Sequence, residues 1–118
     1  MQIVNVVIDC LDPDRLSPFW EAATGRQRTW SNGEFVVLSA DSPGQPLLLL
    51  QRVPEAKIGK NRCHLDLGAP ELEAEVERLI GLGARRGETH DLGFVRWTVM
   101  ADPDGNEFCL SSAHSATT

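Results

Sequence analysis

The chain has 118 residues, enough for one domain with a buried core, and its net charge of −6 argues against nucleic acid or an anionic membrane surface as the main partner. The start MQIVNVVIDC lacks the features of a signal peptide, and no apolar run reaches the roughly 18 residues of a membrane span. Three cysteines without a CxxC motif predict reduced thiols in a cytoplasmic protein.

The first 53 residues predict a strand, a helix and three more strands. QIVNVVID is short and rich in Val and Ile, which is typical of a strand. In DPDRLSPFWEAATG, Pro18 predicts a short turn to Leu16 and then a helix that Ser17 caps and Gly25 ends. Further strands are predicted in QRTW, EFVVLSA and PLLLLQRV, the first two joined by an Asn-Gly hairpin and the last buried on both faces.

Residues 54–62 are polar and contain Pro and Gly, which predicts a loop, and residues 63–112 then repeat the plan. CHLDLG predicts a strand, and PELEAEVERLIGLG predicts a helix that buries Leu72, Val76, Leu79 and Ile80. The stretch ARRGE is interpreted as a surface loop. GFVRWTVMA and EFCLSS predict strands around the turn DPDGN, and the tail 113–118 is expected to be frayed.

A fixed offset of 59 residues aligns the two halves, placing Asn5 on His64, Phe35 on Phe94 and Leu50 on Cys109. Identity is low, but the order of elements agrees. Such a repeat predicts two similar modules, each a mixed sheet with a helix on its outer face.

Two βαβββ modules in this length, with DPDRLSPFWEAATG, HLDL and the closing DPDGNEFCL, resemble the vicinal oxygen chelate superfamily of glyoxalases, bleomycin-resistance proteins and extradiol dioxygenases. The closest form is the small bacterial glyoxalase-like domain. The resemblance implies an α+β fold in which two modules form cupped mixed sheets with helices on the outer faces. It also implies one glyoxalase-like domain over 1–118, a small-molecule ligand in the sheet cavity, and a homodimer.

In metal-dependent members the ligands come from the first and last strands of each module. The resemblance carries these positions to Asn5, His64, Cys109 and Leu50, or to Leu48 or Gln51 after a register slip. Leucine cannot ligate a metal, and neutral Asn is a weak ligand suited to hard ions. We therefore expect no complete metal site and no cofactor, although His64 and Cys109 suit a divalent ion such as zinc.

His64 has three interpretations: a metal ligand, a hydrogen-bonding or acid–base residue, or a strand histidine without a role. Asp66 is expected on the same strand face as His64, and Asp9 on the same face as Asn5. Strand aspartates are disfavoured, so these carboxylates either serve the site or bond to the backbone, Arg62 or Arg96.

Cys109 is either a reactive thiol or a small core residue, and Trp30 and Trp97 either line the cavity or only pack. Two function classes remain open. One is a binding protein for a small organic molecule, with Asn5, Asp9, Trp30, Trp97 and Cys109 as its contacts. The other is a lyase, isomerase or dioxygenase-type enzyme in which His64, with Asp66, acts as a metal ligand or general base.

Overall fold

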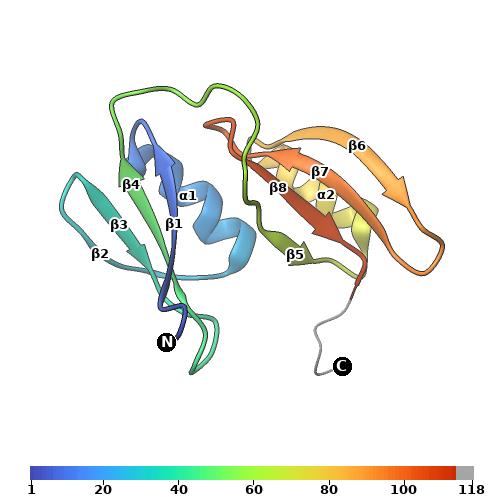
Figure 1. Cartoon of the computed structure of the whole chain (residues 1–118), viewed down its shortest axis with the longest axis horizontal. Coiled ribbons are helices and arrows are strands. Elements are labelled where there is room, and N and C mark those ends of the chain that lie inside the picture. The colour runs from blue at the N-terminus through green and yellow to red at the C-terminus, as the bar shows by residue number, and fades with distance from the viewer. Residues whose placement is uncertain (114–118) are drawn as a thin grey trace. The chain divides into compact units, whose positions relative to one another are not determined.

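The computed structural model describes residues 1–113, and the predicted tail at 114–118 lies outside them. The chain divides into two compact units, residues 1–57 and 58–118, with the boundary inside the predicted loop (Figure 1). Unit one contains β1 (Asn5–Cys10), α1 (Pro13–Thr24), β2 (Arg28–Ser31), β3 (Phe35–Leu38) and β4 (Leu47–Arg52). Unit two contains β5 (Asp66–Gly68), α2 (Leu72–Gly81), β6 (Arg85–Asp91), β7 (Arg96–Ala101) and β8 (Glu107–Ser111).

Each unit is a βαβββ module. Unit one has a four-stranded sheet in the order β1-β4-β3-β2, and unit two has one in the order β5-β8-β7-β6. In both, the first and last strands pair in parallel while the other neighbours are antiparallel, so the sheets are mixed. The α+β class with two repeated modules is therefore confirmed. No helix among residues 1–113 is long and apolar enough to cross a membrane.

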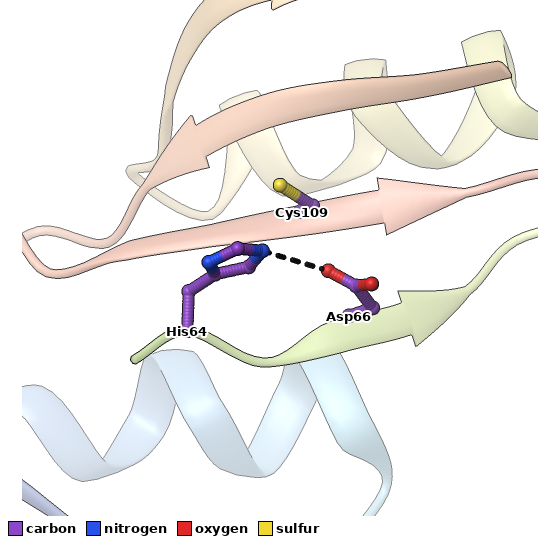
Figure 2. A group of neighbouring side chains, drawn as sticks. All are labelled: His64, Asp66 and Cys109. Carbon is purple, nitrogen blue, oxygen red and sulfur yellow. Dashed lines mark ion pairs between the residues drawn. The ribbon is translucent and has the colours of Figure 1, made fainter. Parts of the chain in front are cut away.

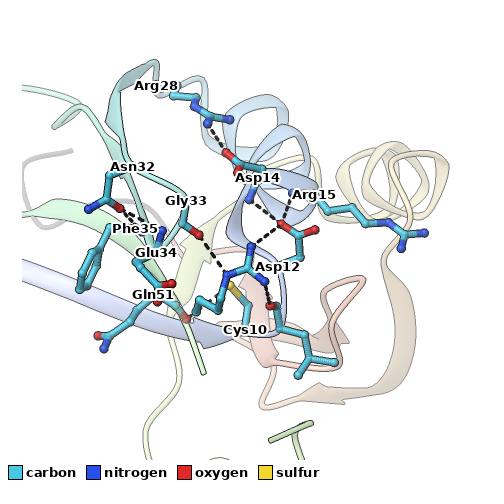
Figure 3. A network of polar contacts seen from close by, with 12 residues as sticks. Cys10, Asp12, Asp14, Arg15, Arg28, Asn32, Gly33, Glu34, Phe35 and Gln51 are labelled. Atoms are coloured by element: carbon cyan, nitrogen blue, oxygen red, sulfur yellow. Dashed lines mark hydrogen bonds and ion pairs between the residues drawn. The ribbon is translucent and has the colours of Figure 1, made fainter. Parts of the chain in front are cut away.

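Helix α1 is continuous, and the predicted break at Ser17 is wrong. Asp12 is the N-cap, and its side-chain Oδ1 accepts hydrogen bonds from the backbone N–H groups of Asp14 and Arg15 (Figure 3). Pro18 lies inside the helix on its exposed side. Burial of Leu16, Phe19 and Trp20 on the other side outweighs the lost backbone hydrogen bond at the proline.

The cap at Asp12 is expected to contribute measurably to stability. Asp12→Ala removes both side-chain bonds to the helix start, and also the contact of Asp12 with Arg52 at 3.4 Å. We expect a loss of about 1 kcal/mol in the free energy of unfolding, measured by urea denaturation. Glu71→Ala is the matched control, because Glu71 is the N-cap of α2 but makes no side-chain cap bond. Equal losses in both variants would contradict the capping role of Asp12.

Strand β4 has one buried face, not the two that its leucine run predicts. Leu48 and Leu50 are buried and lie opposite Val6 and Ile8 of β1, whereas Leu47 is 37% exposed. Helix α1 contacts β3 and β4, and with Val36 and Leu38 these side chains form the core of unit one. The other face of this sheet, which we call the open face, carries Asn5, Val7, Asp9, Leu47, Leu49 and Gln51.

Strand β6 is the element that the sequence interpretation missed. Its residues RRGETHD are polar and all exposed, so they show no alternation of apolar and polar side chains. The strand is nonetheless paired with β7, from Arg85 opposite Ala101 to Asp91 opposite Arg96, with a register shift between Arg86 and Thr89. Arg86 also forms a two-bond ion pair with Glu73 of α2, which joins this edge strand to the helix.

Helix α2 buries Leu72, Val76 and Leu79 as predicted, but Ile80 is 38% exposed. The turn DPDGN is confirmed as a structural device. The buried Asp102 carboxylate accepts hydrogen bonds from the backbone N–H groups of Asp104 and Asn106 and from the Asn106 side chain. Gly105 adopts a φ of 90°, which favours glycine at that position.

Candidate functional site

Three potential metal-binding or catalytic side chains come together at the start of β5. His64 Nε2 lies 3.2 Å from Asp66 Oδ1, and Cys109 approaches them from the neighbouring strand β8 (Figure 2). The donor atoms of the three residues all lie within 4.8 Å of one another. We call this group the His–Asp–Cys cluster.

The backbone pairing explains why these residues meet. Asp66 begins β5 and lies directly opposite Cys109, so both side chains project from the same face of the sheet. The Cys109 N–H donates to the Leu65 carbonyl at 2.8 Å, which fixes the register just before the strand. His64 precedes the strand that was predicted to contain it, because β5 is limited to Asp66–Gly68.

The loop that carries His64 is attached to the end of β8. The Glu107 carboxylate accepts hydrogen bonds from Lys60 Nζ and from the Asn61 backbone N–H, both at 3.1 Å. The Asn61 side chain in turn donates to the Glu107 carbonyl at 3.0 Å. These bonds hold the loop against the strand only two residues from Cys109, and they position His64 beside the cluster.

The cluster has an exposed and a buried part. The side chains of His64 and Asp66 are 47% and 64% exposed, whereas Cys109 is 5% exposed. Burial raises the pKa of the Cys109 thiol, and the nearby negative charge of Asp66 raises it further. Cys109 is therefore a protonated thiol at neutral pH and a poor nucleophile in the free protein.

This shift predicts the alkylation behaviour of Cys109. The pH at which its iodoacetamide reaction reaches half the maximal rate should lie above that of N-acetylcysteine amide measured alongside, because only the thiolate reacts. Asp66→Asn should lower this pH, since it removes a neighbouring negative charge. Peptide mass spectrometry separates Cys109 from the exposed Cys63 and the buried Cys10. A midpoint for Cys109 at or below that of the reference thiol would contradict the assignment.

A stacked pair of rings lies on the same sheet face, farther along the strands. Trp97 is paired with His90 of β6 and with Ser111 of β8, and Val99, two residues on, lies opposite Cys109. The His90 and Trp97 ring centroids are 5.2 Å apart with an interplanar angle of 25°. Trp97 thus shares a face with Asp66 and Cys109, and His90 extends its aromatic surface.

A family model described as a glyoxalase-like domain matches residues 5–111, nearly the whole chain. The chain belongs to the glyoxalase-like domain family. This confirms the resemblance to the vicinal oxygen chelate superfamily. A search of curated proteins gave no match.

Solved structures share the fold of this glyoxalase-like domain. A glyoxalase/bleomycin resistance protein/dioxygenase family enzyme from Burkholderia phytofirmans PsJN has a TM-score of 0.77 at 18% identity, covering 94% of this chain and 98% of that chain. A glyoxalase-related enzyme from Fulvimarina pelagi has a TM-score of 0.73 at 17% identity, covering 94% and 87%. Lactoylglutathione lyase from Agrobacterium tumefaciens has a TM-score of 0.69 at 17% identity, covering 92% and 91%.

The strand pairing revises the alignment of the two modules. Val7 lies opposite Leu49, and Asp66, its counterpart 59 residues later, lies opposite Cys109. Leu49, not Leu50, is therefore the counterpart of Cys109. Leu50 is fully buried on the helix-contacting face, as is the alternative Leu48, whereas the other alternative, Gln51, lies on the open face.

The four family positions do not fit a metal in this glyoxalase-like domain. Leu49 and Leu50 both lack a donor atom, so the register correction leaves that position without a ligand. Asn5 lies on the open face of unit one, opposite Leu47, which also has no donor. No chemistry is derived through a four-ligand metal here.

The remaining candidates lie on the open face of unit one. Asp9 is paired with Gln51, and Trp30 is 54% exposed and paired with Val37, whose partner in turn is Leu49. Apolar side chains occupy the centre of this face. The ligand-binding roles of Asn5, Asp9 and Trp30 stay predictions.

Sequence reasoning missed two contributors to the site of this domain. His90 lies in the unrecognised strand β6, so its pairing with Trp97 was not predicted. Asn61 and Lys60 were assigned to a plain loop, although Glu107 binds both. The available signal was the acidic residue that opens β8 and the basic loop before CHLDLG, but spacing alone does not join segments 46 residues apart.

Proposed function

We propose that this glyoxalase-like domain binds a small organic molecule on the sheet face of unit two, without the complete four-ligand metal site that the family implies. One observation carries the proposal: an ion pair between His64 and Asp66 that is held half in solvent beside a buried thiol. Within residues 1–113, Asp66 pairs with this histidine and not with Arg62 or Arg96.

The arrangement suits a ligand with both a flat and a polar part. The pair of His64 and Asp66 offers a hydrogen-bond donor and acceptor with exposed edges. Trp97 and His90 offer a ring surface on the same face, where planar or cationic groups stack favourably. Between them lie the small side chains of Val99 and Ser111, which leave the face accessible. We therefore expect planar ligands with a cationic or hydrogen-bonding group.

A thermal-shift screen tests this proposal. Planar and cationic compounds are tested on the full chain with EDTA present, and a hit at about tenfold its Kd should raise Tm by about 5 °C. The shift should be lost in His64→Ala and reduced in Asp66→Asn. Glu55→Gln neutralises an exposed carboxylate in unit one and should leave the shift unchanged. Hits that shift wild type and His64→Ala equally would contradict the proposal.

Enzymatic use of His64 is the second candidate. A carboxylate 3.2 Å from one ring nitrogen orients an imidazole and supports it as a general base, as in other His–Asp pairs. Hits with a C–H bond beside a carbonyl can be incubated in D2O and followed by NMR. Deuterium uptake with wild type, lost in His64→Ala and slowed in Asp66→Asn, would support catalysis. Uptake that is unchanged in His64→Ala would exclude His64 as the base.

We also propose that the protein is a homodimer in a reducing cytoplasm. Its three cysteines are free thiols, as expected where disulfides do not form. Light scattering after size exclusion should give about twice the chain mass of 13.0 kDa. A mass of one chain would contradict the dimer.

A further inference from the structure

The His–Asp–Cys cluster presents three different donor types to one point. They are an imidazole nitrogen, a carboxylate oxygen and a sulfur, and all lie within 4.8 Å of one another. We propose that His64, Asp66 and Cys109 bind one transition-metal ion of the zinc class, entirely within unit two. This site goes beyond the binding of an organic molecule, because it should fill with the metal alone.

The distances are close to those of a tetrahedral site. Zinc bonds nitrogen and oxygen at about 2.0 Å and thiolate sulfur at about 2.3 Å, so neighbouring donors in a tetrahedron lie roughly 3.3–3.8 Å apart. His64 Nε2 and Asp66 Oδ1, at 3.2 Å, already have this spacing. The upper limit of 4.8 Å for the remaining pairs requires side-chain rotation only, since the backbone register of β5 and β8 is fixed.

The donor set selects the class of ion. Mg²⁺ and Ca²⁺ take oxygen ligands, whereas a mixed nitrogen, oxygen and sulfur set suits Zn²⁺ and Co²⁺. Three protein ligands leave a fourth position for water or for a donor atom of a bound molecule. The exposed edges of His64 and Asp66 give an ion direct access from solvent.

This site differs from the one that the family positions imply. It takes no ligand from unit one, so the missing donors at Asn5 and Leu49 do not matter. It instead uses Asp66, which the family pattern does not require and whose exposed carboxylate sits beside Cys109. The loop bonds from Glu107 to Asn61 and Lys60 hold the third ligand, His64, in place.

Cobalt and zinc titrations of the reduced, EDTA-treated full chain test the site without any organic ligand. We expect one Co²⁺ per chain with a near-ultraviolet thiolate-to-cobalt absorption band, and one competing Zn²⁺ by calorimetry. The absorption band should disappear in Cys109→Ser. His64→Ala and Asp66→Asn should weaken Zn²⁺ binding about 100-fold or more, because even a partner behind a ligand contributes roughly 10–100-fold.

Cys63→Ser is the matched control, since Cys63 is an exposed thiol next to His64 in sequence but outside the cluster. It should keep the absorption band and the affinity. Far-ultraviolet circular dichroism of each variant checks that it is folded. The proposal is overturned if folded wild type binds no stoichiometric metal, if Cys109→Ser keeps the band, or if Cys63→Ser loses it. Because no organic compound is used, these outcomes are independent of the thermal-shift screen.

Discussion

Replacing Trp20 by alanine is expected to lower the free energy of unfolding by about 3–5 kcal/mol, the range for deleting a large buried aromatic side chain. Trp20 is 1% exposed and packs edge-on against Phe19, with ring centroids 5.3 Å apart at an interplanar angle of 88°. Its side chain fills the core between α1 and its sheet. Urea denaturation followed by circular dichroism measures the loss.

Trp30→Ala is the matched control for this deletion. Trp30 is 54% exposed on strand β2, so the same substitution should cost less than about 1 kcal/mol. Trp20→Phe keeps a ring in the core, should cost less than Trp20→Ala, and gives a measurable value if the alanine variant is unfolded. Similar losses for Trp20→Ala and Trp30→Ala would contradict the position of the core.

Replacing Leu50 by alanine is expected to cost about 2–5 kcal/mol, because the deleted methyl groups leave a cavity in the core. Leu50 is 0% exposed and lies between Ile8 and Val36 on neighbouring strands. This prediction tests which face of β4 contacts α1. It therefore also tests the conclusion that Leu50 is a core residue and not part of the open face.

Leu47→Ala serves as the control on the same strand. Leu47 is 37% exposed and projects from the opposite face, so its truncation should cost about 1 kcal/mol or less. Circular dichroism during urea denaturation gives both values. A larger loss for Leu47→Ala than for Leu50→Ala would show that the faces of β4 are assigned the wrong way round.

The repeat in the sequence predicted the fold because both modules use the same order of elements, and the N-cap positions of their helices, Asp12 and Glu71, keep the offset of 59 residues. It could not predict strand register. The turns before β4 and β8 differ in length, which moves the counterpart of Cys109 from Leu50 to Leu49. A shift of one residue exchanges the two faces of a strand, so a small error in offset changed the face.

Local rules were wrong where tertiary packing decides. Pro18 predicts a helix break, but burial of Leu16, Phe19 and Trp20 keeps α1 continuous. Strand β6 has no apolar face and forms because β7 supplies its hydrogen-bond partners. Its polar sequence therefore hid His90, and the ring pair with Trp97 was not predictable from spacing.

The candidate site was predictable only in part. The pairing of His64 with Asp66 followed from their separation of two residues, and the geometry agrees although His64 lies before the strand. Cys109 was identified by the repeat, but its contact with Asp66 depends on the parallel pairing of β5 and β8. That pairing joins segments 43 residues apart, which no local pattern specifies.

Backbone amide NMR of the uniformly labelled chain, titrated with a hit from the ligand screen, tests the central claim that the site lies on the sheet face of unit two. The account predicts that the largest shift changes fall at His64, Asp66, Trp97 and Cys109, with saturation at one molecule per chain. Changes confined to Asn5, Asp9 and Trp30 in unit one, with the unit two residues unmoved, would contradict it.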